Sequence, residues 1–377
     1  MTPLQALDTP TAVVDVPRMR RNIARMQARA DALGVAFRPH VKTSKCTAVV
    51  EAQLAAGARG ITVSTLKEAE RFFEAGVTDI LYAVGLAPSK LPQVAALRRR
   101  GCDLKVIVDN PVAARAIADL AASDDLRLET WIEIDTDGHR SGIEPEDVLL
   151  LQVGRILHDG GARLGGVLTH AGSSYDCTDE ASLRAIAERE RAGAVRAAER
   201  LRDAGLPCPV VSVGSTPTAL TALHLDGVTE LRAGVYVFFD LVMHNVGVCT
   251  VDEIALGVLT TVIGHQHDKG WAIVDAGWMA MSRDRGTRTQ RRDFGFGLVC
   301  DESGTPLDGW LMTAANQEHG IVALARGRDP DVAARFPVGT RLRVLPNHAC
   351  ATGAQHPAYV AIGDAGTQRT WPRFGGW

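Results

Sequence analysis

The amine of Lys42 is the side chain in this sequence best placed for covalent chemistry. Lys42 follows a short apolar run and stands two residues after His40, in the stretch PHVKTSK at positions 39–45. A partly desolvated lysine near other cations is a good nucleophile and can form an imine with an aldehyde. By its position alone, Lys42 could equally well be an ordinary lysine in a solvated loop, as could the nearby Lys45.

Two glycine-containing turns have the composition of an anion site. Gly214, Ser215 and Thr216 precede a predicted helix, and N–H groups at a helix start together with hydroxyls suit a phosphate. Gly234 and Tyr236 follow the next predicted strand and could complete that site. Each turn alone fits an ordinary helix cap, but two adjacent turns favour a phosphate site.

His348 and Cys350 could ligate a metal ion. If their segment is extended, residues i and i+2 point the same way, so the imidazole and the thiolate could share one ion. Zinc is the natural ion for that pair, and two protein ligands leave positions open for water or substrate, as in a catalytic site. Spacing alone favours the alternative of a structural histidine beside a buried cysteine.

Short apolar runs alternate with helical patterns over the first two-thirds of the chain. The predicted strands are 35–39, 60–63, 79–83, 105–108, 129–134, 165–169, 210–213 and 230–232. Eight such alternations predict an α/β fold with a (β/α)8 TIM barrel, and a doubly wound open sheet is the alternative. Helices are expected to end at Gly34, Gly76 and Gly205, and Thr65 with Glu68 resembles a capping box.

The candidate residues gather at one rim of this predicted barrel. The first strand leads to His40 and Lys42, the fifth to Arg140, and the sixth to His170 and Tyr175. The seventh and eighth strands lead to the two glycine-containing turns. Because barrel active sites lie at the carboxyl ends of the strands, this pattern predicts an active site there.

After about residue 251 the pattern becomes β-rich. Strands are predicted at 254–264, 271–274, 320–325 and 341–345, without a long amphipathic helix. The early run 11–14 has no role in the barrel, so we expect it to pair with this C-terminal β-rich domain. The predicted domains are therefore a barrel over 15–250 and a β domain over 1–14 and 251–377.

Composition limits the function classes. The chain has 377 residues, is 46% hydrophobic and carries a formal net charge of −3, which does not indicate a nucleic-acid partner. No apolar run approaches the roughly 20 residues that span a bilayer, and we see no signal peptide. Seven cysteines without a CxxC pair suggest reduced thiols in the cytoplasm.

Six motifs in order resemble the D-serine dehydratase and D-threonine aldolase family of pyridoxal-phosphate (PLP) enzymes, whose barrel is shared with alanine racemase. The motifs are PHVKTSK (39–45), GHRSG (138–142), THAG (169–172), GSTP (214–217), NQEHG (316–320) and PNHAC (346–350). The resemblance covers essentially the whole chain. It implies a homodimer that acts on a small D-amino acid.

The resemblance also implies roles for particular residues. Lys42 would carry PLP, with Arg140 near the pyridoxal ring oxygen. The other cofactor residues would be His170, Tyr175, Gly214, Ser215, Thr216, Gly234 and Tyr236. His348 and Cys350 would bind a divalent metal (Zn, Mn, Co or Mg), and His40 and Gln317 would contact the substrate. Candidates for holding a second substrate carboxylate are Arg140, His170, Arg283 and Gln317.

The implied reaction is a PLP- and metal-dependent dehydration of a D-3-hydroxy amino acid, such as D-threo-3-hydroxyaspartate or D-serine, to a 2-oxo acid and ammonia. The alternative is an aldolase that yields glycine and an aldehyde. His348-x-Cys350 followed by Ala351 is the dehydratase pattern, whereas the aldolases carry His-x-Asp followed by Pro. A non-catalytic PLP-binding protein would lack the β domain and the metal pair, and a racemase would need a second acid–base residue and no metal.

Overall fold

The computed structural model of the chain, which describes residues 6–124 and 126–377, divides into two units. The barrel unit contains Ala24–Gly234 and Gly376–Trp377, and the β unit contains the described part of Met1–Ile23 and Val235–Gly375. The division after Gly234 differs from the boundary expected near residue 250. Residues 235–250 join the β unit because Leu241 and Val242 donate backbone hydrogen bonds to Pro346 and Asn347 (both 3.1 Å).

Eight parallel strands form the barrel and confirm the predicted TIM barrel. They are β2 (Ala36–Pro39), β3 (Ile61–Val63), β4 (Asp79–Gly85), β5 (Asp103–Val108), β6 (Glu129–Ile134), β7 (Arg163–Thr169), β8 (Val210–Val213) and β9 (Glu230–Ala233). Their order is β2-β9-β8-β7-β6-β5-β4-β3, and a single bridge between His40 and Thr62 joins the two ends. The sheet therefore closes just before Lys42.

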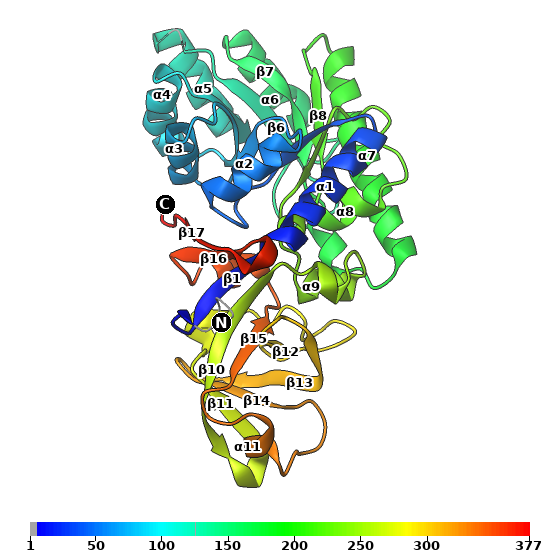
Figure 1. Cartoon of the computed structure of the whole chain (residues 1–377). Coiled ribbons are helices and arrows are strands. Elements are labelled where there is room, and N and C mark those ends of the chain that lie inside the picture. The colour runs from blue at the N-terminus through cyan, green and yellow to red at the C-terminus, as the bar shows by residue number, and fades with distance from the viewer. Residues whose placement is uncertain (1–5, 125) are drawn as a thin grey trace. The chain divides into compact units, whose positions relative to one another are not determined.

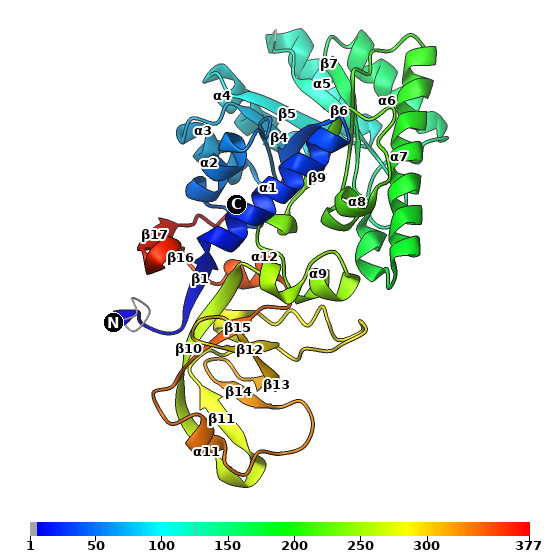
Figure 2. The ribbon, with the colours of Figure 1, turned by 45° about the vertical axis from the view of Figure 1, so that its right-hand side comes forward.

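Helices lie outside the strands of the barrel (Figure 1). They are α1 (Val16–Ala32, which begins in the β unit), α2 (Thr47–Ala55), α3 (Leu66–Glu74), η2 (Pro88–Lys90), α4 (Leu91–Arg99), α5 (Pro111–Asp124), α6 (Val148–Asp159), η3 (Gly172–Asp176), α7 (Glu180–Asp203) and α8 (Thr216–Thr221). Thr65 caps α3 by accepting from the Glu68 N–H (3.0 Å). Helices α1, α3 and α7 end just before Gly34, Gly76 and Gly205, as predicted. Helix α7 packs against β7 and β8, and Figure 2 shows this long helix on the right-hand side of the barrel unit.

Ion pairs join several strands inside the barrel. Arg38 on β2 donates to Glu230 on β9 and to Asp79 on β4 (both 2.7 Å), and Lys105 on β5 donates to Asp79 (2.7 Å). An arginine on β2 can reach β4 past the intervening β3 only on the inner side of the barrel. Removing one partner of such a buried pair leaves an uncompensated charge, so the network constrains how these four strands pack.

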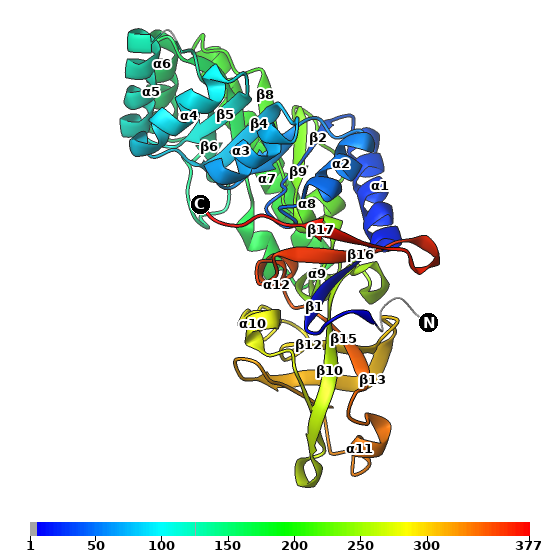
Figure 3. The ribbon, with the colours of Figure 1, turned by 60° about the vertical axis from the view of Figure 1, so that its left-hand side comes forward.

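The β unit is a nine-stranded sheet in the order β11-β14-β13-β12-β15-β10-β1-β16-β17. Its strands are β1 (Thr11–Asp15), β10 (Leu256–Gln266), β11 (Trp271–Val274), β12 (Gly297–Asp301), β13 (Pro306–Ala315), β14 (Gly320–Leu324), β15 (Arg341–Leu345), β16 (Ala358–Ile362) and β17 (Gln368–Pro372). Strand β1 pairs with β10 and β16, which confirms the expected role of the early run (Figure 3). Strands β12, β13, β16 and β17 were not predicted.

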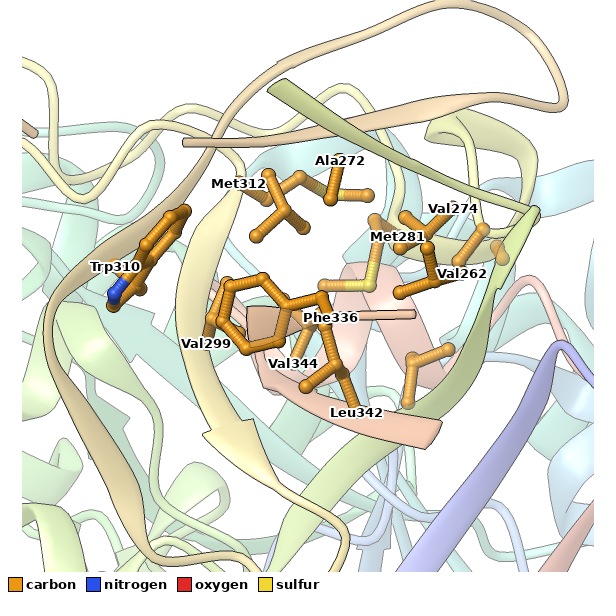
Figure 4. Close-up of a cluster of buried hydrophobic side chains, with 14 of the residues drawn as sticks. Val262, Ala272, Val274, Met281, Val299, Trp310, Met312, Phe336, Leu342 and Val344 are labelled. Carbon is orange, nitrogen blue, oxygen red and sulfur yellow. The ribbon is translucent and has the colours of Figure 1, made fainter. Parts of the chain in front are cut away.

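Short helices complete the β unit. Across the described part of the chain, no helix combines the length and the apolar character needed to span a membrane. They are η4 (Val235–Val237), α9 (Leu241–Val246), η5 (Val251–Glu253), η6 (His267–Lys269), α10 (Trp278–Met281), α11 (Val332–Arg335), α12 (Ala349–Gly353) and η7 (Asp364–Gly366). The strands of this sheet contribute most of an apolar cluster, in which Trp310 and Phe336 meet edge to face with ring centroids 4.7 Å apart (Figure 4).

We expect Val344→Ala to lower the free energy of unfolding by about 2–3 kcal/mol, because it removes two buried methyl groups from this cluster and leaves a cavity. Val344 is fully buried. The matched control is Val338→Ala, since Val338 is exposed and its truncation should change stability by less than about 0.5 kcal/mol. Urea unfolding measures both, and equal effects of the two substitutions would contradict the observed core.

Candidate active site

The carboxyl ends of the barrel strands bring several predicted residues together around Lys42. The His40 N–H donates to Ala233 O (2.8 Å), which holds the start of the lysine segment against β9. Lys42 and Arg140 are close enough to both His40 and His170 to influence the pKa of each imidazole. The barrel rim therefore contains the lysine, two histidines and an arginine that sequence analysis selected.

Lys42 and Lys45 have different surroundings. The Nζ of Lys45 pairs with the Glu68 carboxylate at 2.9 Å. Among the described residues no carboxylate lies within ion-pair distance of Lys42, which is only partly exposed. The structure thus distinguishes the two lysines that the sequence could not distinguish, because among the described residues only Lys45 is bound by a carboxylate.

His40 and His170 are uncharged at neutral pH. Burial is the main cause, and the nearby Lys42 adds to it, so that the pKa of His170 falls to about 3 and the pKa of His40 falls well below its ordinary value. His170 Nδ1 lies 3.2 Å from the Gly214 carbonyl, which can only accept. Nδ1 therefore carries the proton, and Nε2 is left as the acceptor.

The turn after β8 is built around Gly214. Its φ is 129°, and a Cβ at this position would lie 2.2 Å from the carbonyl oxygen of Arg232, so only glycine fits. Ser215 caps α8, because its Oγ accepts from the Thr218 N–H (3.2 Å) while its own N–H donates to Thr218 Oγ1 (2.9 Å). Ser215 therefore shapes this turn, and its predicted contact with a phosphate stays a prediction.

The loops after β6 and β7 are joined by hydrogen bonds. Ser173 donates to Asp137 through its N–H (2.9 Å) and its Oγ (2.7 Å). Arg140 is exposed and lies 3.9 Å from the Glu133 carboxylate. The Tyr175 ring lies 6.1 Å from the His170 ring, centroid to centroid. The two loops thus bring Arg140 and Tyr175 to the same rim as His170.

Two buried charges at this rim were missed by sequence analysis. Arg232, at the end of β9, donates to Ser212 Oγ (2.6 Å) and to the Thr169 carbonyl, and burial lowers its pKa. Burial raises the pKa of Glu133. The sequence signal that could have found both residues is a charged residue inside an otherwise apolar strand, because burying a charge is costly unless it is paired.

In the β unit, His348 and Cys350 lie at a strand-to-helix junction. The prediction of an extended segment was wrong, because His348 is the N-cap of α12 and Cys350 lies in its first turn. The side chains nevertheless meet through a hydrogen bond, since the turn places position N2 beside the cap. The pair is brought together by a local geometry that differs from the predicted one.

Asp284 orients His348. Its Oδ2 lies 2.5 Å from His348 Nδ1, and the carboxylate is held in turn by the Gly286 N–H (2.8 Å). Burial by itself would lower the pKa of His348, but attraction to Cys350 and the bond to Asp284 raise it to about 11. Sequence analysis did not select Asp284, which is 64 residues away in the chain.

These surroundings suit a cation. A carboxylate on one ring nitrogen, with the other nitrogen turned toward a second ligand atom such as the Cys350 sulfur, is the usual arrangement behind a metal-binding histidine. The described residues contain no group of three or more His, Cys, Asp or Glu side chains that could hold a metal ion. His348 and Cys350 would therefore hold an ion as a two-ligand pair, open to water or substrate.

Of the remaining predicted residues, Gly234 lies beside His40, because a Cβ on it would be 3.1 Å from the His40 carbonyl oxygen, whereas Gln317 and Tyr236 belong to the β unit. Gln317 is exposed in the β unit, and its carbonyl accepts from the Met279 N–H (3.1 Å). Tyr236 is fully buried in η4 of the β unit, whereas Gly234 belongs to the barrel unit. The structure gives no direct contact that assigns Gln317 or Tyr236 to a ligand.

Family models match both parts of the chain. The alanine racemase N-terminal domain matches residues 14–242, and a putative serine dehydratase domain matches residues 255–362. The chain is 68% identical over 99% of both sequences to D-threo-3-hydroxyaspartate dehydratase from a Delftia species. The solved structure of that enzyme superposes with a TM-score of 0.99.

More distant relatives have related names. The chain is 29% identical to D-serine dehydratase from Dictyostelium discoideum, over 94% of this chain and 93% of the relative. It is also 29% identical to D-threonine aldolase from an Arthrobacter species, over 98% of this chain and 93% of the relative. The chain therefore belongs to the family in which an alanine-racemase-type barrel is followed by a serine dehydratase domain.

Proposed function

We propose that this protein is a PLP- and divalent-metal-dependent dehydratase that converts D-threo-3-hydroxyaspartate to a 2-oxo acid and ammonia. The observation that carries the proposal is the 68% identity to the Delftia dehydratase over 99% of both chains. The likeness to D-serine dehydratases supports D-serine as a second substrate.

PLP fits the residues at the barrel rim. Lys42 offers an amine without a carboxylate partner, and Arg140 and Arg232 supply positive charge near it for an anionic cofactor. We propose that Lys42 holds PLP with Arg140, His170 and Tyr175 around the ring. The phosphate residues would be Gly214, Ser215, Thr216, Gly234 and Tyr236. PLP supplies an electron sink for negative charge that develops at the α-carbon of the substrate.

Lys42 is the proposed base for the α-proton. A general base must present an unoccupied lone pair near the proton that it removes. No carboxylate among the described residues holds the Lys42 amine, and the neighbouring imidazoles of His40 and His170 are uncharged. We assign His40 to orientation of the substrate, because its imidazole lies beside the Lys42 backbone N–H (3.5 Å).

His348 and Cys350 are the proposed metal ligands. Imidazole and thiolate favour zinc, and manganese, cobalt or magnesium are the other candidates. A divalent ion held by these residues would supply Lewis acidity at the β-hydroxyl of the substrate. Asp284 holds His348 so that its other ring nitrogen faces Cys350. A cysteine-to-alanine variant of the Delftia enzyme has a structure described as metal-free, which supports a metal-binding role for this family.

A second substrate carboxylate requires a cation. Arg283 is exposed, its guanidinium stacks over Trp278 (4.1 Å to the ring centroid), and it is adjacent in sequence to Asp284. Arg140 by contrast faces Glu133, and His170 is uncharged. We therefore favour Arg283 over Arg140, His170 and Gln317 for this role.

Retro-aldol cleavage is the second candidate reaction. The likeness to D-threonine aldolases favours it, but that likeness is more distant than the likeness to the dehydratase. We also propose a cytoplasmic homodimer. None of the seven cysteines, all of which lie in the described chain, forms a disulfide bond, as expected in a reducing compartment.

We expect the purified protein to convert D-threo-3-hydroxyaspartate to a 2-oxo acid and ammonia, and Lys42→Ala to lower kcat/KM by at least about 10³-fold because the base is lost. Mass spectrometry of the products and an ammonia assay measure both. Glycine and an aldehyde as the products would identify an aldolase instead, and undiminished activity of Lys42→Ala would contradict the assignment of the lysine.

Cys350→Ala should remove the bound divalent ion and abolish the dehydratase activity, because one ligand cannot retain the metal. The matched control is Cys300→Ala, since Cys300 is a fully buried cysteine of the same unit in β12. Elemental analysis after dialysis reports the metal content of each variant. If both variants keep the same metal content as the unaltered protein, the His348 and Cys350 assignment is wrong.

His170→Asn should flatten the pH dependence of stability. The pKa of His170 is about 3 when folded, against about 6.5 unfolded, so below pH 6.5 the unfolded chain binds more protons. As the pH falls from 7 to 5, protonation of this histidine in the unfolded chain should therefore lower the free energy of unfolding by about 2 kcal/mol. Asparagine can still donate to the Gly214 carbonyl but does not titrate. Urea unfolding at both pH values should therefore show a smaller decrease in the free energy of unfolding for this variant. An identical decrease in both proteins would refute a neutral, buried His170.

A further inference from the structure

We propose that the ion pair between Lys45 and Glu68 positions Lys42, so that both are positioning residues for the cofactor lysine. The inference rests on the proposed function, since it assumes that Lys42 holds PLP. It is carried by three features of the barrel unit: the seam where the sheet closes, the conformation of Lys45 and the environment of Glu68.

The lysine segment leaves the barrel at its seam. Strands β2 and β3 share one bridge, between His40 and Thr62, whereas every other neighbouring pair in the barrel has a register of two or more residue pairs. Two backbone bonds reinforce this seam, from Val41 N–H to Thr62 O (2.9 Å) and from Arg59 N–H to Phe37 O (2.8 Å). The position of Lys42 therefore depends on contacts beyond the strands.

The backbone that carries Lys42 is a closed turn. The Lys45 N–H donates to Val41 O (2.9 Å), so the turn encloses Lys42. Lys45 has a φ of 45°, in the left-handed region that a lysine rarely adopts. A strained residue of this kind persists only where its surroundings determine it, and such residues concentrate at functional sites.

Glu68 supplies the surroundings that determine this turn. Its side chain is 2% exposed, and its carboxylate receives Lys45 Nζ (2.9 Å), the Ser64 N–H (3.1 Å) and Ser64 Oγ (3.0 Å). Glu68 also belongs to the cap of α3, through its N–H bond to Thr65. One buried carboxylate thus joins the turn around Lys42 to the start of α3, on the far side of the seam.

The same pair keeps Lys45 from acting in place of Lys42. The two amines are three residues apart in one turn, but only the Lys45 amine is bound by a carboxylate among the described residues. Charge-assisted hydrogen bonds of this kind have well-defined geometry. The pair therefore fixes one lysine and leaves the other available to an aldehyde.

The test compares variants in the cofactor-free protein. Glu68→Gln keeps the shape and one of the two oxygens that accept from Ser64 but removes the charge. Lys45→Met removes the amine, and Lys45→Arg retains a cation. Glu70→Gln is the matched control, because Glu70 lies on the same helix and forms a half-buried pair with Lys67 (2.8 Å), away from the Lys42 turn. The readouts are the Kd for PLP from absorbance titration and the position of the borohydride-trapped adduct by peptide mass spectrometry. Thermal melting of each cofactor-free variant controls for folding.

Glu68→Gln and Lys45→Met should each weaken PLP binding about 10- to 100-fold, the value of a charge-assisted hydrogen bond. The double variant should be no weaker than the single ones, because both remove the same pair. Lys45→Arg should stay within about threefold of the unaltered protein, and Glu70→Gln should not change. In Glu68→Gln a part of the adduct should move to Lys45.

Three outcomes would overturn the inference. Glu68→Gln could bind PLP as Glu70→Gln does, with all adduct on Lys42. The PLP affinity lost in Lys45→Met could fail to recover in Lys45→Arg, although both variants melt as the unaltered protein does. Finally, additive losses of PLP affinity in the double variant could show that the two residues act separately. If the unaltered protein itself forms no adduct with PLP, the proposed function fails as well, which distinguishes that result from the others.

Discussion

The pairing of charges that are removed from water is the constraint on which the barrel unit depends. Arg38 joins three strands because Glu230 and Asp79 both bind it inside the barrel. At the rim, the Glu68 carboxylate likewise pairs with the Lys45 amine. An unpaired buried charge would cost several kcal/mol, so each pair restricts where its strands can lie. Against this background, Lys42 stands out as a lysine at the rim that no described carboxylate binds.

The elements of the barrel could be predicted because their sequence signals are local. Strands buried on both faces are continuous apolar runs, and all eight were found within one or two residues at most of their ends. Of the four missed strands of the β unit, β12 and β16 do contain such runs and were overlooked, whereas β13 and β17 lack them. Strand β13 contains Asp308 and Gly309, the latter with a φ of 76°, and its pairing with β12 and β14 is irregular. Strand β17 has mostly exposed or half-buried side chains and no apolar pattern.

The site was predictable only in part, because its supporting contacts connect distant parts of the sequence. Lys42, His348 and Cys350 were selected by motif, but Asp284 and Glu68 acquire their roles through partners that a linear pattern does not reveal. The extended geometry predicted for His348 and Cys350 failed for a related reason. Asp240 binds the Ala349 N–H (2.9 Å) and thereby helps to start α12 where an extended chain was expected. The same contact accounts for the early boundary of the β unit, since Asp240 also caps α9.

In the proposed mechanism, the two units supply two kinds of chemistry. The alanine racemase model matches the barrel with its lysine, and the serine dehydratase model matches the β unit with the histidine–cysteine pair. A barrel that holds PLP activates the α-carbon, and this step is common to racemases, aldolases and dehydratases. What happens at the β-carbon depends on groups that bind the β-oxygen, and in the proposed mechanism these belong to the β unit. In the proposed mechanism, changes at position 350 or in the segment around Asp284 would therefore alter the outcome at the β-carbon while the ion pairs that shape the barrel stay intact.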